Sequence, residues 1–281
     1  MLAVTGSNGF LGKKFIIFLK KKKITFIRLP KIIKKNHFNK FYFSSQALKK
    51  FLKDKKIKYI IHFAGVRKII CDQNFSFSKE SIYYLTKNIC NQIKKTGLNV
   101  KLIYISTDHV FDGKSRFYKE NNIKNLKPYN NLGKLKLLTE NYIKKEIKHW
   151  IIVRTSAIMD DPRLSSFVKM HLKKKKKIDL FSNVFFTPVY SGDLNKLIFK
   201  IVKLNIIKKI FHCSGQKRLS KYNFYVSLFG KNNFFIKKNI KDFSKNSRDL
   251  SLSNAKTCSD LKFSVTNYRK SINITRKILN Y

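Results

Sequence analysis

Residues 5–12 read TGSNGFLG, and this stretch decides the fold. It follows an apolar run at residues 2–5 and precedes a helical segment at residues 13–20. Its three glycines permit a tight turn, let the backbone approach a pyrophosphate and allow the helix to pack closely on the strand, while the helix N-terminus supplies amide donors. At the start of a strand-helix pattern this spacing predicts a dinucleotide-binding turn rather than an ordinary one. The residues expected to contact the cofactor are Gly6, Ser7, Asn8, Gly9, Phe10, Leu11 and Gly12.

The chain beyond this turn alternates short apolar runs with longer, lysine-rich amphipathic segments. Between residues 81 and 95, for example, Ile82, Leu85, Ile89 and Ile93 recur at three- and four-residue spacing, which places them on one helical face. Strands that alternate with helices imply right-handed βαβ units and a parallel sheet. We therefore predict an α/β fold: a Rossmann-type, doubly wound parallel sheet with a small C-terminal substrate-binding lobe. The predicted strands are residues 2–5, 24–29, 59–63, 102–106 and 150–154.

We further expect the chain to be divided between a domain and a lobe. Residues 1–158 should form most of the NAD(P)-binding domain, to which the chain returns at about residues 185–214. Residues 159–184 and 215–281 should form the lobe. With 4 Pro and 10 Gly, the chain is too poor in both for a flexible linker, so the lobe should pack closely on the domain.

The chain is strongly basic, with 62 Lys or Arg against 15 Asp or Glu and a formal net charge of +47. Such a surplus can indicate a polyanionic partner. Only 9 of the 62 basic residues are Arg, however, and Arg is the residue that reads phosphates and bases in a bidentate manner. The lysine runs are better explained by compositional drift and solvated helix ends, so nucleic-acid binding ranks last.

Composition also limits the class of protein. With 43% apolar residues, 25 Phe and 13 Tyr, the chain can bury a substantial core and is not expected to be disordered. No stretch approaches the roughly 18–20 apolar residues of a membrane helix, and residue 1 leads directly into an apolar run, so neither membrane insertion nor secretion is expected. The four cysteines form no CxxC pair, which predicts reduced thiols in a cytoplasmic protein without a zinc site.

The end of the second predicted strand bears on the choice of cofactor. An acidic residue there would hold the ribose 2′-hydroxyl of NAD, but this chain has Arg28 followed by Lys31, Lys34 and Lys35. A cation in place of the acid favours a 2′-phosphate, so NADP(H) is preferred over NAD(H). The alternative is that Arg28 is one more surface base in a basic protein.

Segments along the chain resemble one family. Residues 60–65 (IIHFAG) resemble a strand end at which small residues, here Ala64 and Gly65, let the backbone approach the dinucleotide. Residues 106–113 (STDHVFDG) are close to the STDYVFDG signature of dTDP-4-dehydrorhamnose reductases. From residue 2 to about residue 255 the chain resembles extended short-chain dehydrogenase/reductases of the dTDP-4-dehydrorhamnose reductase-like family. Other matching segments are 128–137 (PYNNLGKLKL) with Glu140, 153–156 (VRTS), 187–194 (TPVYSGDL), 211–215 (FHCSG) and 219–222 (LSKY).

The resemblance implies a catalytic group of Thr or Ser, Tyr and Lys, in which the phenol donates a proton to a carbonyl oxygen as hydride arrives from the nicotinamide. It assigns Thr107 and Lys136 to that group, with Lys136 also binding the ribose. The Tyr position is Leu132, which cannot donate, and loss of a general acid typically costs about 10²- to 10⁴-fold in rate. Tyr129 could replace it if the segment before Gly133 is irregular; otherwise Tyr129 is a partly buried aromatic at a helix entry.

The resemblance also implies substrate-binding roles for Asp108, His109 and Arg154. His109 stands where the signature has Tyr, and Ala157 where a Trp is usual, which suggests a different ligand or relaxed selection. His109 is expected either to donate a proton, its reference pKa being about 6.5, or to form part of the pocket wall. Arg154 is expected either to place anionic substrate groups or to bond a carbonyl in the core.

Two functions of different classes follow from the resemblance. The first is an NAD(P)H-dependent oxidoreductase, a reductase or a related epimerase or dehydratase, acting on a keto-deoxysugar nucleotide as in dTDP-rhamnose biosynthesis and impaired by the loss of the catalytic Tyr. The alternative is a catalytically inactive NAD(P)-binding scaffold or regulatory subunit that resembles the methionine adenosyltransferase β subunit. The expected partner is a nucleotide sugar. No bound metal and no membrane or nucleic-acid partner is expected, and the sequence is compatible with a homodimer.

Overall fold

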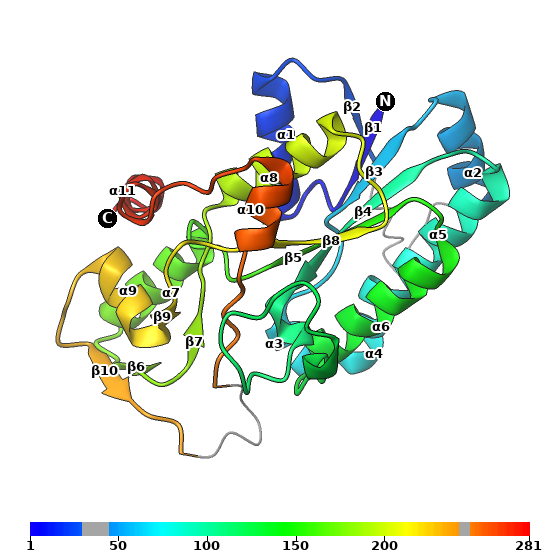
Figure 1. Cartoon of the computed structure of the whole chain (residues 1–281). Helices are drawn as coiled ribbons and strands as arrows, with labels where there is room; N and C mark the ends of the chain where they lie inside the picture. Colours follow the sequence, from blue (N-terminus) through cyan, green and yellow to red (C-terminus); the bar gives the residue numbers. More distant parts are fainter. Residues whose placement is uncertain (30–44, 242–247) are drawn as a thin grey trace.

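The computed structural model describes residues 1–29, 45–241 and 248–281. Its main sheet has six parallel strands in the order β2-β1-β3-β4-β5-β8 (Figure 1). This confirms the predicted doubly wound, Rossmann-type α/β fold. The strands are β1 (Leu2–Thr5), β2 (Phe26–Arg28), β3 (Tyr59–His62), β4 (Lys101–Thr107), β5 (Trp150–Thr155) and β8 (Lys209–Cys213).

The strand order reverses between β1 and β3. From β1 the chain moves outward to β2 and then crosses to β3 on the opposite side of β1. In open α/β sheets such a switch point leaves a crevice at the carboxyl ends of the strands, where ligands bind. The glycine turn follows β1 and the small residues Ala64 and Gly65 follow β3, so both flank this crevice.

Helices cover both faces of the sheet (Figure 1). One face packs on α1 (Phe10–Lys21) and α8 (Ser191–Lys203), and the other on α2 (Ser45–Asp54), α5 (Leu85–Thr96) and α6 (Asn131–Glu146). Successive side chains of a strand point to opposite faces, so each strand supplies both cores. In β4, Ile103 and Ile105 pack toward α1 and α8, whereas Leu102 and Tyr104 pack toward α2, α5 and α6.

The predicted helix at residues 81–95 differs from the one observed. Helical structure begins earlier, in α4 (Phe75–Lys79), and passes through a π-helical turn, η1 (Glu80–Tyr84), before α5. A π turn adds a residue and so rotates the apolar stripe. Ile82 accordingly packs beneath α6 with Leu132, while Ile89 and Ile93 pack on the sheet.

Segments from the second half of the chain pack beside the sheet around two further apolar clusters. One cluster joins α7, α9 and α11, and the other joins α7, α9 and the two-stranded β6-β10 pair. The division of the chain into domain and lobe remains a prediction.

No helix among the described residues is long and apolar enough to span a bilayer. The remaining elements are α3 (Lys68–Gln73), η2 (Asp108–Val110), η3 (Ile123–Asn125), α7 (Pro162–Lys173), β6 (Ile178–Phe181), β7 (Phe185–Phe186), β9 (Leu219–Ser220), α9 (Lys221–Phe229), β10 (Phe235–Lys238), α10 (Ala255–Leu261) and α11 (Tyr268–Leu279).

Candidate active site

The glycine turn forms a tight, backbone-lined loop at the end of β1. Gly6 adopts a left-handed φ of 63°, and its carbonyl accepts a hydrogen bond of 2.9 Å from the Gly9 amide. A Cβ on Gly12 would lie 2.2 Å from the Gly6 carbonyl oxygen, so a side chain cannot fit there without moving the backbone. Within the described part of the chain no side chain caps the N-terminus of α1, so its first amides can bind an anion. The loop therefore fits a diphosphate.

The ends of β1 and β3 are held together by a buried histidine. His62 is 0% exposed and lies between Thr5, 2.5 Å from Nδ1, and Thr86, 2.9 Å from Nε2. The Thr86 hydroxyl donates to the Ile82 carbonyl, so it accepts from Nε2–H, and Nδ1 accepts from Thr5. Burial, with a contribution from the charge of Lys136, lowers the pKa of His62 to about 3. The imidazole is therefore neutral in the folded protein.

This histidine predicts a pH dependence of stability. Between pH 6.5 and 3 the unfolded chain binds a proton at residue 62 that the folded chain does not, so the free energy of unfolding falls as the pH falls. We expect the His62→Gln variant, which keeps a donor and an acceptor, to reduce the loss of stability between pH 6 and pH 5 by about 1.2 kcal/mol relative to wild type. Urea unfolding at the two pH values measures this difference; parallel pH profiles would contradict it.

The end of β4 carries a hydrogen-bonded pair. The Thr107 hydroxyl donates to Asp108 Oδ1 over 3.0 Å, and Asp108 Oδ2 accepts from Ser156 over 2.8 Å. Burial raises the pKa of Asp108, opposed by nearby His109 and by these hydrogen bonds. Asp108 is thus a buried residue that orients Thr107, while Thr107 is partly exposed at the carboxyl end of the strand.

The side chain of His109 is fixed by the N-terminus of α6. Asn130 caps that helix through Oδ1, which accepts from the Gly133 amide over 2.9 Å. Its amide nitrogen is thereby directed at His109 Nδ1, 2.9 Å away, so Nδ1 is an acceptor and the ring proton lies on Nε2. Burial lowers the pKa of His109, against the opposing charge of Asp108. The imidazole is neutral and presents an Nε2–H donor.

Tyr129 lies outside the helix, immediately before the Asn130 cap. The segment before Gly133 is therefore irregular, which is the condition under which Tyr129 could replace the missing phenol. Its hydroxyl lies 3.2 Å from His109 Nδ1. Because Nδ1 carries no proton, the phenol donates to it. No hydrogen bond joins Tyr129 to Thr107 or Lys136.

Leu132 and Lys136 share one face of α6, four residues apart. Lys136 is buried, donates to the Ile105 carbonyl over 2.7 Å, and would lie 3.7 Å from a Cβ on Gly65. Burial lowers the pKa of Lys136 to about 8. Leu132 is 9% exposed and packs with Cys71, and its assignment to the Tyr position of the family remains a prediction.

Contacts at the end of β3 connect the glycine turn to Lys136, the predicted catalytic lysine. A Cβ on Gly6 would lie 2.6 Å from the Ala64 amide nitrogen, so the glycine turn touches the end of β3. Gly65 in turn lies beside Lys136.

Arg28 is exposed at the carboxyl end of β2, next to β1. Lys31, Lys34 and Lys35, which were also predicted to favour a 2′-phosphate, lie outside the described residues.

Arg154 does not bond a carbonyl in the core, which was one of the two expectations for it. Its guanidinium is 0% exposed, and Nε and Nη2 donate to Glu140, with the shortest contact at 2.7 Å. Glu140 Oε1 also accepts from Ser106 over 2.5 Å. The pair ties α6 to β4 and β5, and a substrate-binding role for Arg154 remains a prediction.

Sequence reasoning missed several residues that shape the site. The capping contact of Asn130 with His109, the His62 bridge between β1 and β3, and the support of Asp108 by Ser156 all join residues distant in sequence. Only Asn130 carried a usable signal, because Asn before a helical segment that continues through glycine is a typical N-cap.

A parallel sheet with a glycine-rich turn at its switch point, a Thr at the end of β4 and a buried Lys on α6 define a Rossmann-fold protein of the extended short-chain dehydrogenase/reductase type. The model of the RmlD substrate binding domain matches residues 1–274. The chain belongs to this family, which confirms the predicted resemblance.

Comparisons with individual proteins agree on this fold. The chain is similar to a dTDP-4-dehydrorhamnose reductase from Clostridium acetobutylicum ATCC 824, with a TM-score of 0.83 and 21% identity over 100% of this chain and 99% of that one. It is also similar to the dTDP-4-dehydrorhamnose reductase from Bacillus anthracis str. Ames in complex with NADP, with a TM-score of 0.82 and 20% identity over 98% and 97% of the two chains.

Similarity to a curated protein is weaker in coverage. The chain is 28% identical over 189 residues to methionine adenosyltransferase 2 subunit beta of Xenopus tropicalis, a match that covers 63% of this chain and 55% of that protein. The chain spans about half the length of the curated relatives it matches.

Proposed function

We propose that the protein is an NAD(P)H-dependent reductase, or a related epimerase or dehydratase, acting on the keto group of a deoxysugar nucleotide. The observation that carries this proposal is the chain of contacts from the glycine turn through Ala64 and Gly65 to Lys136, which donates to the Ile105 carbonyl two residues before Thr107 in β4. Family membership supports the substrate class. A nucleotide-sugar ligand also suits the basic charge of the protein.

The described residues fit a nicotinamide dinucleotide. The backbone of residues 6–12 and the first amides of α1 would hold its diphosphate, Lys136 a ribose, and Arg28 a 2′-phosphate. When bound, the cofactor supplies or accepts a hydride. NADP(H) is preferred over NAD(H) because the end of β2 offers an exposed cation and no acid.

The chain itself must then supply hydrogen-bond donors to the carbonyl oxygen of the substrate. In the absence of a phenol at position 132, the donor that remains is the Nε2–H of His109, whereas the Thr107 hydroxyl donates to Asp108 and would have to rotate to reach the substrate. A neutral imidazole can polarise a carbonyl without being charged. Tyr129, which contacts the other nitrogen of the same ring, would hold the imidazole in place rather than act on the substrate directly.

The proposal is tested with purified protein, NADPH and a dTDP-4-keto-6-deoxyhexose. We expect calorimetry to detect NADPH binding, tighter than NADH, with the preference reduced in the Arg28→Ala variant. We also expect slow, substrate-dependent loss of NADPH absorbance. If calorimetry detects no binding of NADPH or NADH, the proposal as a whole is wrong. If the protein binds NADPH but does not oxidise it, only the scaffold function described next is left.

A second candidate is a cofactor-binding scaffold without turnover. It is favoured by Leu132 at the position of the catalytic phenol, and by the similarity to a protein described as the β subunit of methionine adenosyltransferase 2. Under this proposal NADPH binds but is not oxidised by any deoxysugar nucleotide, and placing a phenol at position 132 does not generate activity.

A further inference from the structure

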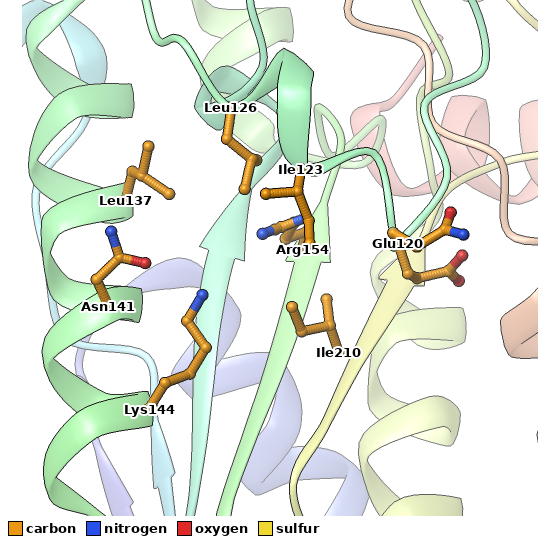
Figure 2. A pocket seen from close by; sticks show the side chains of 9 residues that line it. Glu120, Ile123, Leu126, Leu137, Asn141, Lys144, Arg154 and Ile210 are labelled. Atoms are coloured by element: carbon orange, nitrogen blue, oxygen red, sulfur yellow. The ribbon is translucent and has the colours of Figure 1, made fainter.

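A cavity of about 460 Å³ lies on the α6 face of the sheet, away from the candidate active site. It is bounded by α6, by β5 and β8, and by the segment that contains η3 (Figure 2). Thr107, His109 and Lys136 do not line it. Its walls are aliphatic at Ile123, Leu126, Leu137 and Ile210 and polar at Asn121 and Asn141. Ile123 is 75% exposed, so the cavity opens to solvent on that side.

One charged side chain in this cavity has an unused hydrogen-bond donor. Arg154 is 0% exposed, and Nε and Nη2 are bound to Glu140. Nη1 has no hydrogen-bond partner in the described part of the chain. Figure 2 shows the end of the guanidinium directed into the cavity. A buried charged donor without an acceptor is rare in native proteins and calls for an explanation.

A second cation reaches the same space from α6. Lys144 is half-buried, and Figure 2 shows its ammonium directed into the space between α6 and β5. It makes no ion pair within the described residues. Burial lowers the pKa of Lys144, with Glu140 opposing and the charge of Arg154 assisting the shift. Glu140, one helical turn before Lys144, is bound to Arg154 and favours the charged form of Lys144, so the two cations share one carboxylate and one positive charge is left without a counter-charge.

The one carboxylate that lines the cavity does not supply that counter-charge. Oε1 of Glu120 accepts a hydrogen bond from the Thr257 hydroxyl over 2.7 Å, and Oε2 is buried without a hydrogen-bond partner among the described residues. Figure 2 shows the carboxyl group turned to the side away from Lys144 and Arg154. The space between the two cations is therefore available to an external anion.

We propose that this cavity is a binding site for a small organic carboxylate, whose carboxylate group contacts Lys144 and Arg154 and whose apolar body lies against the aliphatic walls. One free guanidinium nitrogen and one ammonium suit the two oxygens of a carboxylate. A phosphate would bring a third oxygen and a second charge against Leu and Ile side chains. The volume is in the range of pockets that enclose small ligands. The site is independent of the proposed reductase function.

Calorimetry with hexanoate tests the proposal on the full-length protein. We expect hexanoate to bind, whereas hexan-1-ol, hexan-1-amine and inorganic phosphate bind at least about tenfold more weakly. Lys144→Met, which keeps the apolar stem and removes the charge, should weaken hexanoate binding by about tenfold or more. The matched control is Lys145→Met, the exposed neighbour on α6 that does not line the cavity, and it should leave the affinity unchanged.

A second variant tests the location without altering charge. Leu137→Phe fills part of the cavity and should also abolish hexanoate binding, with melting temperature used to confirm that each variant is folded. Equal affinity for hexan-1-ol, preferential binding of the amine or of phosphate, or unchanged affinity in folded Lys144→Met protein would each overturn the proposal.

Discussion

Leu132→Tyr is expected to raise the rate of NADPH-dependent reduction of a keto-deoxysugar nucleotide by about 10²- to 10⁴-fold. The substituted side chain would stand four residues before Lys136 on the same face of α6. A phenol there has a buried ammonium nearby that favours its ionised form, so it can donate a proton to the carbonyl oxygen. Initial rates at saturating NADPH measure the effect.

The control for this substitution is Leu132→Phe, which adds the ring without the hydroxyl. Both variants overfill the cluster that contains Cys71, Ile82 and Leu135, at a cost of about 1–3 kcal/mol in the free energy of unfolding. Only the Tyr variant should gain activity, and that gain should fade above pH 8, because burial lowers the pKa of Lys136 to about 8 and the ammonium is lost. Equal rates in the two variants would contradict a catalytic role for this position and favour the scaffold proposal.

The local parts of the fold could be predicted from the sequence because their signals are local. The spacing of Gly6, Gly9 and Gly12 is a requirement of one turn, and the apolar runs that follow it form parallel strands close to their predicted bounds. The assignment of Leu132 to the Tyr position rests on Lys136 lying one helical turn beyond it, and it remains a prediction. The helix that contains Ile82 was predicted less well, because nothing in the periodicity signals a π turn.

The arrangement of polar groups around the site could not be predicted in the same way. Arg154 and Glu140 are 14 residues apart, and their pairing depends on which face of α6 meets β5. His109 Nδ1 accepts a hydrogen bond from Asn130, the capping residue of α6. The sequence does not specify how the loop between the two residues folds, so this contact could not be predicted. The cavity beside Arg154 requires α6, β8 and η3 to be placed together, which no motif specifies.

Removal of the Glu140 carboxylate should have the largest effect on stability. Glu140 and Arg154 are both 0% exposed, so Glu140→Ala leaves a guanidinium buried without its counter-charge. Breaking a buried pair in this way costs about 3–5 kcal/mol, a large share of the 5–15 kcal/mol typical of a folded protein. The Ser106 hydroxyl loses its acceptor as well. Urea unfolding measures the loss.

The double variant Glu140→Leu/Arg154→Met separates the cost of an unpaired charge from that of lost packing. It removes both charges and keeps aliphatic volume between α6 and β5, so it should recover most of the stability lost in Glu140→Ala. If the double variant were as unstable as the single one, shape rather than charge would hold these elements together. A loss below about 1 kcal/mol in Glu140→Ala would instead mean that water reaches Arg154 through the adjoining cavity and solvates it there.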